Sequence, residues 1–308
     1  MADPTRKRVR KAVLPVAGLG TRVLPATKSI PKEMLPVFDR PALQYVIDEA
    51  LAAGIEHFVL VTGRNKGAIE DYFDRAYELE DSLRIKGKIS VLAEVQATTP
   101  KAGAMSFVRQ QAPLGLGHAV WCARDIVGDE PFAVMLPDML MMAQPSCLWQ
   151  MAQAYDKVGG AIIAVEQTDA PEQYGVIDPD TRPEGFGGRL IKMKGMVEKP
   201  ARAHAPSNLF ISGRYILPPE IFNILDTQQP GAGGEIQLTD AMARLMQTHP
   251  FHAFEFAGRS YDCGDKIGYL RATMAFALAN PQLGEAVRTA ALEELDRFTG
   301  PRKRAAND

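Results

Sequence analysis

The sequence has little cysteine and no long apolar segment. Its three cysteines, Cys122, Cys147 and Cys263, are odd in number and widely spaced, which argues against a disulfide framework. No run of about eighteen uninterrupted apolar residues occurs, so we expect no transmembrane helix. The basic segment 6–11 resembles the start of a secretion signal, but Pro15 and the glycines after it break the apolar stretch that such a signal needs. We therefore expect reduced thiols and a cytoplasmic protein.

Neither sign of charge dominates. The 35 lysines and arginines face 37 aspartates and glutamates, which gives a formal net charge of -2. The chain thus lacks the basic excess that draws proteins onto nucleic acids, and we expect neither nucleic acid nor membrane as a partner. Apolar residues make up 46% of the chain, enough for a large core in a single large domain.

The first half alternates between strand and helix patterns. Residues 11–17 form a short apolar run that ends in glycines, which is typical of a buried strand. A helix is predicted from Pro41 to a stop at Gly54, and residues 57–62 form the next strand. This order indicates a right-handed crossover between two parallel strands. The alternation then continues with a helix at 65–79, a strand near 89–96, a helix near 118–126 and a strand at 132–136.

These patterns predict an α/β fold with a Rossmann-like central sheet, mixed but mostly parallel, flanked by helices. After about residue 165, short strand-like runs separated by proline, glycine and aspartate indicate added β-hairpins. Two helices are predicted to close the chain. We therefore expect a single domain, residues 9–297, made of the segments 9–165, 166–265 and 266–297 with its helices at 266–279 and 284–297, followed by a flexible tail at 298–308.

The most informative segment is Ala17–Lys32, AGLGTRVLPATKSIPK. Gly18 and Gly20 let backbone N–H groups approach a phosphate, while Arg22 and Lys32 supply positive charge beside it. A dinucleotide-binding loop is the rival, but its third glycine would fall at position 23, which is valine, and the Walker-A spacing fails as well. A tight turn with surface charges is the alternative for two glycines alone. The longer string favours a triphosphate-binding loop.

Further motifs follow in order along the chain: PLGLGHAV at 113–120, LPD at 136–138, YGVI at 174–177, VEKP at 197–200, GEIQLTDA at 234–241 and YDCGDKIGY at 261–269. Together with the opening LPVAGLGTRVLPATKSIPKEMLPV, they make the chain resemble the nucleoside-diphosphate-sugar pyrophosphorylases, most closely the bacterial UDP-glucose pyrophosphorylases. Only the two ends lie outside the resemblance. Val23, where an aromatic is common, and Met139 depart from the family's strings, but both are side-chain changes next to the chemistry.

The resemblance implies that UTP and glucose 1-phosphate are converted to UDP-glucose and pyrophosphate with Mg2+ as cofactor, on the fold of the nucleotide-diphospho-sugar transferases. Residues 9–165 would bind the nucleotide and 166–265 the sugar. The phosphate of glucose 1-phosphate is already an anion at neutral pH, so no side chain needs to remove a proton from it. In agreement, the sequence offers no convincing Ser/His/Asp or Cys/His constellation.

Carried over residue by residue, the resemblance gives Arg22 and Lys32 a catalytic role, because they would draw charge toward the departing pyrophosphate. Gln110 would read the uracil edge, since an amide matches both a carbonyl and an N–H, and Gly115 would let the backbone lie against the ring. A solvated residue at a helix end is the alternative for Gln110. We expect His118 to be a hydrogen-bonded structural residue. The nucleotide-binding set is Ala17, Gly18, Gly20, Thr21, Gln110 and Gly115.

Asp138 and Asp262 are the expected metal ligands, and Asp138 is also assigned a catalytic role. Mg2+ prefers a few carboxylates together with phosphate oxygens and water, and both aspartates follow apolar strands. For either aspartate alone, a cap on a turn is the alternative. Asp265 is expected to cap the helix that begins at Lys266.

Sugar phosphate binding is assigned to the second half. The resemblance implies that Glu198 accepts hydrogen bonds from sugar hydroxyls and that Lys199 neutralises the incoming phosphate, although neighbouring strand residues point to opposite faces unless a bulge or turn re-aims them. An exposed Glu–Lys pair is the alternative. Gly175 and Gly213 are expected where the backbone approaches the hexose, with structural bulges as the alternative.

Three rival functions remain at this stage. One is the same chemistry with dTTP, whose base thymine differs from uracil by a methyl group. A sensor that binds nucleotide-sugars without turnover is possible on any such fold. An NAD-dependent dehydrogenase would need the missing third glycine. Relatives commonly form dimers or tetramers, and the C-terminal helices are the expected interface, but a helix that packs on its own domain gives the same pattern.

Overall fold

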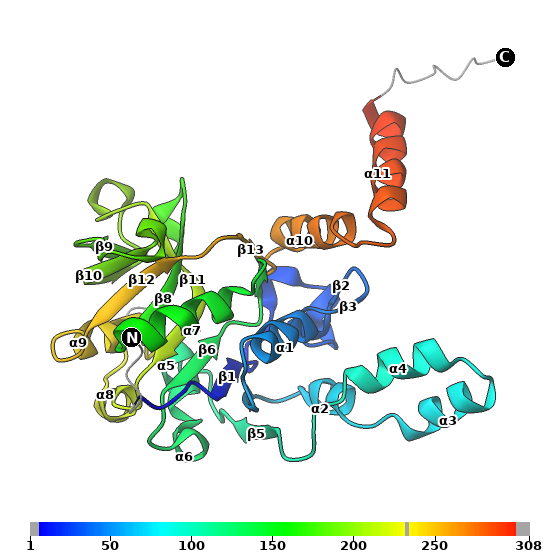
Figure 1. The fold of residues 1–308 in the computed structure, drawn as a ribbon, viewed down its shortest axis with the longest axis horizontal. Coiled ribbons are helices and arrows are strands. Elements are labelled where there is room, and N and C mark those ends of the chain that lie inside the picture. Colours follow the sequence, from blue (N-terminus) through cyan, green and yellow to red (C-terminus); the bar gives the residue numbers. More distant parts are fainter. Residues whose placement is uncertain (1–5, 232–233, 300–308) are drawn as a thin grey trace.

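The computed structural model describes residues 6–231 and 234–299, and its centre is one nine-stranded sheet (Figure 1). The strand order is β5-β4-β1-β6-β11-β8-β12-β10-β9. These strands are β1 (Lys11–Pro15), β4 (His57–Thr62), β5 (Met105–Arg109), β6 (Phe132–Met135), β8 (Ala161–Gln167), β9 (Gly175–Pro179), β10 (Leu190–Glu198), β11 (Leu209–Leu217) and β12 (Phe251–Glu255).

Helices cover both faces of this sheet (Figure 1). One apolar core lies between the sheet and the helices α1 and α7, and the other lies between the sheet and α5, α6, α8 and α9. The helices are α1 (Ala42–Ala52), α2 (Gly67–Phe73), α3 (Tyr77–Ile85), α4 (Ile89–Ala97), α5 (Leu116–Trp121), α6 (Arg124–Val127), α7 (Cys147–Val158), α8 (Ile221–Thr227), α9 (Leu238–Leu245), α10 (Lys266–Leu278) and α11 (Gly284–Thr299).

β1 shows why a short apolar run becomes a central strand. Successive side chains of a strand point to opposite faces. Ala12 and Leu14 therefore enter the core on the α1 side, while Val13 enters the core on the α5 side. β1 pairs in parallel with both β4 and β6. The carboxyl ends of these three strands thus lie at one edge of the sheet, which is where α/β folds bind their ligands.

A single strand, β11, runs opposite to its neighbours in the middle of the sheet. The strands β5, β4, β1 and β6 are parallel, as are β8 and β12, whereas β11 runs antiparallel to both β6 and β8. All nine residues of β11 are buried. β9 and β10 form the antiparallel pair expected after residue 165. The predicted α/β class with a mixed central sheet flanked by helices is therefore confirmed.

One element prediction is wrong, and two more are wrong in part. Residues 89–96 form helix α4 and not a strand, and α4 packs with α3 in a helical hairpin that projects from the body (Figure 1). A short apolar run does not distinguish strand from helix, and the strand at this place in the chain is β5, which the sequence analysis missed. The helix predicted at 65–79 ends at Phe73 and resumes at Tyr77, and the one at 118–126 is divided into α5 and α6.

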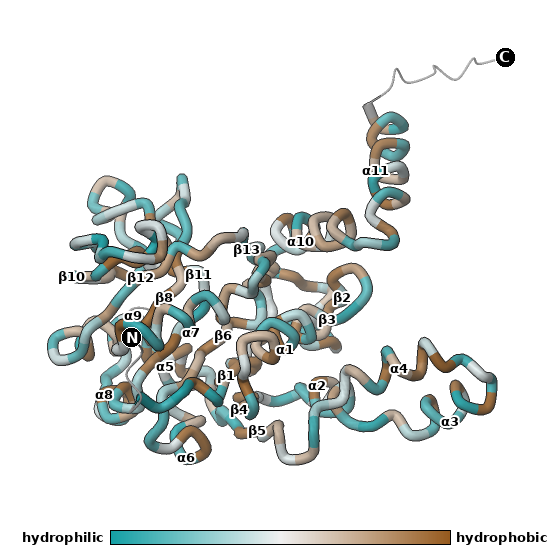
Figure 2. Tube along the Cα trace, in the orientation of Figure 1, coloured by the Kyte–Doolittle hydropathy of each residue, from teal (hydrophilic) through white to brown (hydrophobic). Residues whose placement is uncertain are grey.

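The end of the chain follows the prediction more closely. α10 begins at Lys266 with Asp265 as its cap, whose side chain accepts the N–H groups of Ile267 and Gly268. α11 extends away from the sheet (Figure 1) and carries apolar positions along its length (Figure 2). It runs to Thr299, two residues into the expected tail, and residues 300–308 lie outside the described part. Among the described helices, none has the length and apolar content to cross a membrane.

Two small sheets complete the fold. β7 (Met139–Met142) pairs with β13 (Arg259–Asp262), and β2 (Pro36–Val37) pairs with β3 (Arg40–Pro41). The first of these matters for the site. In it Asp262 lies opposite Met139, so it is brought next to the segment that follows β6.

Candidate active site

The glycine-rich loop begins where β1 ends and folds back over Lys32. Gly20 has a left-handed backbone with φ of 67°, and its carbonyl accepts a 2.7 Å hydrogen bond from Thr27 Oγ1. A Cβ atom on Gly20 would lie 3.1 Å from Cβ of Lys32 and 3.2 Å from Cγ2 of Thr27. A Cβ atom on Gly18 would lie 3.8 Å from Lys32 Nζ. The loop therefore needs glycine at position 20 and lies against the Lys32 ammonium group at position 18.

Lys32 and Asp138 form an ion pair at this edge of the sheet. Lys32 Nζ donates a 2.5 Å hydrogen bond to Asp138 Oδ2, and both side chains are more than four-fifths buried. Burial favours the neutral carboxyl, but the charge and hydrogen bond of Lys32 outweigh it and lower the pKa of Asp138. Burial likewise opposes the charge on Lys32, while Asp138 and Glu33 raise its pKa. Both groups are therefore charged at neutral pH.

Asp262 and Arg22 both lie close to Gly264. A Cβ atom on Gly264 would come within 2.5 Å of Arg22 Nη2 and 2.7 Å of Asp262 Oδ1, so glycine is required between them. The N–H of Cys263 donates a 2.7 Å hydrogen bond to the Asp138 carbonyl and fixes the two segments side by side. Burial raises the pKa of Asp262, repulsion from Asp138 adds to the rise, and Gly264 N–H and Arg22 oppose it.

The two aspartates fit a divalent cation. They are partly buried carboxylates from adjacent segments, and their charges repel each other unless a cation lies between them. Within residues 6–231 and 234–299, no group of three or more histidine, cysteine, aspartate or glutamate side chains is arranged to hold a metal. Two carboxylates suit Mg2+, which completes its coordination with phosphate oxygens and water.

Gln110 follows β5 and is buried beside the second glycine turn. Its Nε2 donates a 3.1 Å hydrogen bond to the carbonyl of Gly115. Gly115 has φ of 101°, and a Cβ atom on it would lie 2.8 Å from the carbonyl oxygen of Ile236 and 2.8 Å from Cβ of Glu235. The need for glycine at 115 is thus explained by the close approach of the segment 234–239, whose Ile236 N–H bonds to the carbonyl of Leu114.

The same segment also contacts the end of β10, where the sequence predicts sugar binding. Thr239 Oγ1 donates a 2.8 Å hydrogen bond to Glu198 Oε2. A Cβ atom on Gly175 would lie 3.0 Å from that carboxylate oxygen, so these two predicted sugar residues are neighbours. Lys199 has a left-handed φ of 45°, which re-aims its side chain away from the alternation of β10.

Gly213 lies where β11 contacts the segment that contains Asp138. It lies in β11 at a register shift between Ile211 and Tyr215 and has φ of 82°. A Cβ atom there would lie 3.0 Å from Met139 Cγ and 3.1 Å from Leu136 Cδ1. Glycine is therefore needed at 213 to bring β11 against the residues on both sides of Asp138.

An open cavity of about 620 Å3 adjoins Asp262. Its lining includes Tyr174 and Tyr261, the aspartates at 262 and 265, and Arg271 and Met274 of α10. The cavity therefore mixes aromatic, charged and apolar groups beside the paired carboxylates.

Comparison with known proteins identifies the family of the chain. The family model described as nucleotidyl transferase matches residues 11–278. The chain belongs to the nucleotidyl transferase family. The UTP–glucose-1-phosphate uridylyltransferase of Bacillus subtilis is 50% identical to it over 279 residues, 90% of this chain and 94% of that protein. The resemblance drawn from the sequence motifs is confirmed.

Solved structures of similar proteins have the same fold. A UTP-bound UGPase from Acinetobacter baumannii matches with a TM-score of 0.85 at 46% identity, covering 92% of this chain and 99% of that one. A UDP-glucose pyrophosphorylase complexed with UDP-glucose matches with a TM-score of 0.76 at 42% identity, covering 87% of this chain and 98% of that one.

This member of the nucleotidyl transferase family also has a buried ion pair beneath its glycine-rich loop, which the sequence analysis missed. Lys66 Nζ donates hydrogen bonds to Glu33 Oε2 at 2.7 Å and to the carbonyl of Gly18 at 2.8 Å. The side chains are 5% and 0% exposed, and Glu33 Oε1 has no partner among the described residues. Burial raises the pKa of Glu33 and lowers that of Lys66. The pair supports the loop from the core side.

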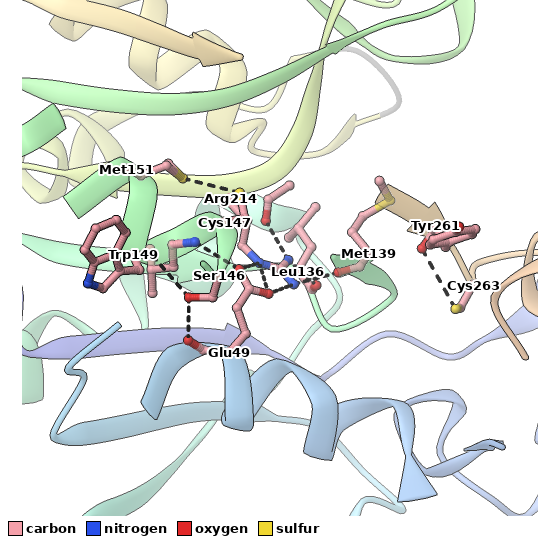
Figure 3. A network of polar contacts seen from close by, with 12 residues as sticks. Glu49, Leu136, Met139, Ser146, Cys147, Trp149, Met151, Arg214, Tyr261 and Cys263 are labelled. Atoms are coloured by element: carbon pink, nitrogen blue, oxygen red, sulfur yellow. Dashed lines mark hydrogen bonds and ion pairs between the residues drawn. The ribbon is translucent and has the colours of Figure 1, made fainter. Parts of the chain in front are cut away.

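A second buried ion pair, which the sequence patterns did not predict, fixes the backbone next to Asp138. The guanidinium group of Arg214 is fully buried and binds both carboxylate oxygens of Glu49 from α1 (Figure 3). Its remaining N–H groups donate to the carbonyls of Leu136 at 3.0 Å and Met139 at 2.7 Å. Arg214 therefore holds the backbone on each side of Asp138. No local pattern signals this contact, because Glu49 and Arg214 are 165 residues apart in the chain.

Proposed function

We propose that the chain catalyses the conversion of UTP and glucose 1-phosphate to UDP-glucose and pyrophosphate. The observation that carries the proposal is the group of charges at the end of β1 and β6, where Lys32, Asp138 and Asp262 converge on a glycine-rich loop. The chain that carries these charges is also 50% identical to the Bacillus subtilis uridylyltransferase over 90% of its length. Fold alone would not establish the activity, but the complete set of charges supports it.

The nucleotide is assigned to the first half of the chain. The loop residues Ala17, Gly18, Gly20 and Thr21 would present backbone N–H groups to the UTP phosphates. Gln110 and the turn at Gly115 would receive the base. Proximity of the two substrates is then the main task of the protein, because positioning lowers the barrier of a reaction between two bound anions.

The reaction needs no proton transfer. An oxygen of the ionised sugar phosphate attacks the α-phosphorus of UTP in line, the bond from that phosphorus to the bridging oxygen breaks, and pyrophosphate leaves with the electron pair. Arg22 and Lys32 would stabilise the charge that develops on the leaving group. Asp138 and Asp262 would hold Mg2+, which neutralises phosphate oxygens when bound.

The sugar phosphate is assigned to the second half. Glu198, fixed by Thr239, would accept hydrogen bonds from the hexose hydroxyls, and Lys199 would approach the phosphate. Gly175 and Gly213 would leave room for the ring, since neither carries a side chain. These four residues come from β9, the end of β10 and β11.

Location and assembly complete the proposal. Three free cysteines suit a reducing compartment, and we place the enzyme in the cytoplasm. We also propose a homodimer or homotetramer, because α11 projects from the body with the side chains of Leu292 and Phe298 more than half exposed. Light scattering tests the assembly, and a monomeric mass would contradict it.

The activity is tested by pyrophosphate release from purified protein with glucose 1-phosphate, Mg2+ and either UTP or dTTP. We expect release with UTP that depends on Mg2+ and is lost in Asp138→Ala. Asp125→Ala, whose side chain on α6 is 82% exposed, is the matched control and should keep full activity. Preference for dTTP would assign the sister activity, and UTP binding without turnover would indicate a sensor.

A further inference from the structure

The orientation of the Gln110 amide is fixed by its neighbours. A backbone carbonyl oxygen can only accept hydrogen bonds, so the amide atom 3.1 Å from the carbonyl of Gly115 must be the NH2 group. The same Nε2 lies 3.1 Å from Nδ1 of His118. Since the NH2 group has no lone pair to offer, Nδ1 must be the acceptor. His118 is therefore neutral and carries its proton on Nε2.

The His118 ring is itself held in place. It stacks on Trp121 with ring centroids 5.7 Å apart and an angle of 28° between the planes. Trp121 Nε1 in turn donates a 3.1 Å hydrogen bond to Asp226 Oδ1, which anchors α5 to α8. Burial lowers the pKa of His118, so the neutral ring that the geometry requires is the form present at neutral pH.

Both protons of the Gln110 amide are thus directed at protein atoms. No described residue donates a hydrogen bond to its Oε1, and this oxygen is not fully buried. Gln110 therefore presents only an acceptor. Of the two contacts predicted from the sequence, with a carbonyl and with an N–H of the base, this geometry leaves only the contact in which Oε1 accepts from the base N–H.

We propose that His118 is a positioning residue for base selection: it locks the Gln110 amide so that Oε1 accepts the N3–H of the base. Uracil has a donor at N3, whereas cytosine has an acceptor there, so an acceptor-only amide favours UTP over CTP. The inference rests on the proposed function, because it needs the base beside Gln110. It assigns His118 a part in specificity beyond the structural role expected from its sequence context.

The kinetic test compares UTP with CTP in His118→Phe and His118→Asn. Phenylalanine keeps the ring and its stacking but has no acceptor, whereas the Oδ1 atom of asparagine can replace Nδ1. One hydrogen bond changes binding by about threefold to tenfold. We expect His118→Phe to raise KM for UTP by that factor, with kcat little changed. The preference for UTP over CTP should fall by a similar factor. His118→Asn should remain within about twofold of the parent protein. Unchanged preference in His118→Phe would overturn the inference.

Two further measurements separate this inference from the proposed function. Gln110→Leu should raise KM for UTP, and if it does while His118→Phe has no effect, the base site stands and the role of His118 is wrong. If Gln110→Leu has no effect either, the base does not bind there. In the unmutated chain, 15N chemical shifts of its five histidines report the tautomer, with His118→Asn identifying the signal. A proton on Nδ1 of His118 would overturn the inference without any change to the site.

Discussion

Lys66 and Glu33 form an ion pair in the core, and the same Lys66 Nζ also binds the carbonyl of Gly18 in the glycine-rich loop. The pair therefore links the interior of the protein to the segment assigned to phosphate binding. Neither side chain reaches solvent appreciably, so removal of one partner leaves the other charge buried without compensation.

We expect Lys66→Met to lower the free energy of unfolding by about 3 to 5 kcal/mol, because Glu33 then remains charged or must be protonated in the core. Urea denaturation measures the change. Glu33→Gln combined with Lys66→Met should recover part of the loss, since it removes the stranded charge. Asp129→Asn breaks an exposed pair with Lys7 and is the matched control, with little change expected. A similar loss of stability in Lys66→Met and in Asp129→Asn would contradict the interpretation.

The Lys32–Asp138 pair predicts a pH window for stability. Pairing lowers the pKa of Asp138 in the folded state, so its contribution is present above the unfolded pKa of about 3.9 and is lost as pH falls through the folded value. Pairing raises the pKa of Lys32, so that contribution is present below about pH 10.4 and is lost as pH rises through the folded value. The stability difference between the parent protein and Lys32→Met should be flat near neutrality and shrink at both extremes. A difference independent of pH would argue against the pair.

We expect the negative charge of Asp262 to lower the stability of the fold while serving the activity. Its pKa is raised by burial and by Asp138, so the folded state binds a proton more tightly than the unfolded state does, and stability falls as pH rises through this range. Asp262→Asn removes this partly buried charge, while the Oδ1 atom of asparagine can still accept the Gly264 N–H. We expect a higher melting temperature at pH 7, a gain that vanishes below about pH 4, and loss of metal-dependent turnover. A lower melting temperature at pH 7 would show the prediction to be wrong.

Gly20 and Gly87 allow backbone strain to be separated from local crowding. Both have φ of 67°, but a Cβ atom on Gly87 meets nothing within 4 Å, whereas one on Gly20 presses on Lys32 and Thr27. Gly87→Ala should cost about 1 to 2 kcal/mol of stability and leave activity unchanged. Gly20→Ala carries the same strain, displaces Lys32 and should reduce kcat strongly. Equal activity in the two variants would exclude a role for the loop in positioning Lys32.

The sequence predicted those elements best that are bounded by residues with strong backbone preferences. β4 was predicted with its observed bounds, and α1 between Pro41 and Gly54 was predicted closely, because proline and glycine mark its ends. Residues 89–96 also lie between a glycine and a proline, Gly87 and Pro100, but an apolar run of this length fits strand and helix equally. β5 was missed because it is a half-exposed edge strand without a clear alternation.

The candidate site divides in the same way. Charged residues just after strands could be predicted, because the ends of parallel strands meet at one edge of a sheet. The partners of these residues could not. Glu49 bonds to Arg214, and Lys66 to Glu33, through contacts that exist only once distant segments have packed together. A buried ion pair has the same local sequence pattern as two exposed charges.

One short segment touches both ends of the proposed product. Ile236 is hydrogen-bonded to the turn beside Gln110, and Thr239, three residues later, holds Glu198. A few residues of covalent chain therefore set the spacing between the proposed base subsite and the proposed hexose subsite. The segment fixes the distance between the two ends of the bound product. A single residue inserted between Ile236 and Thr239 would therefore lengthen that distance and change which nucleotide-sugars fit.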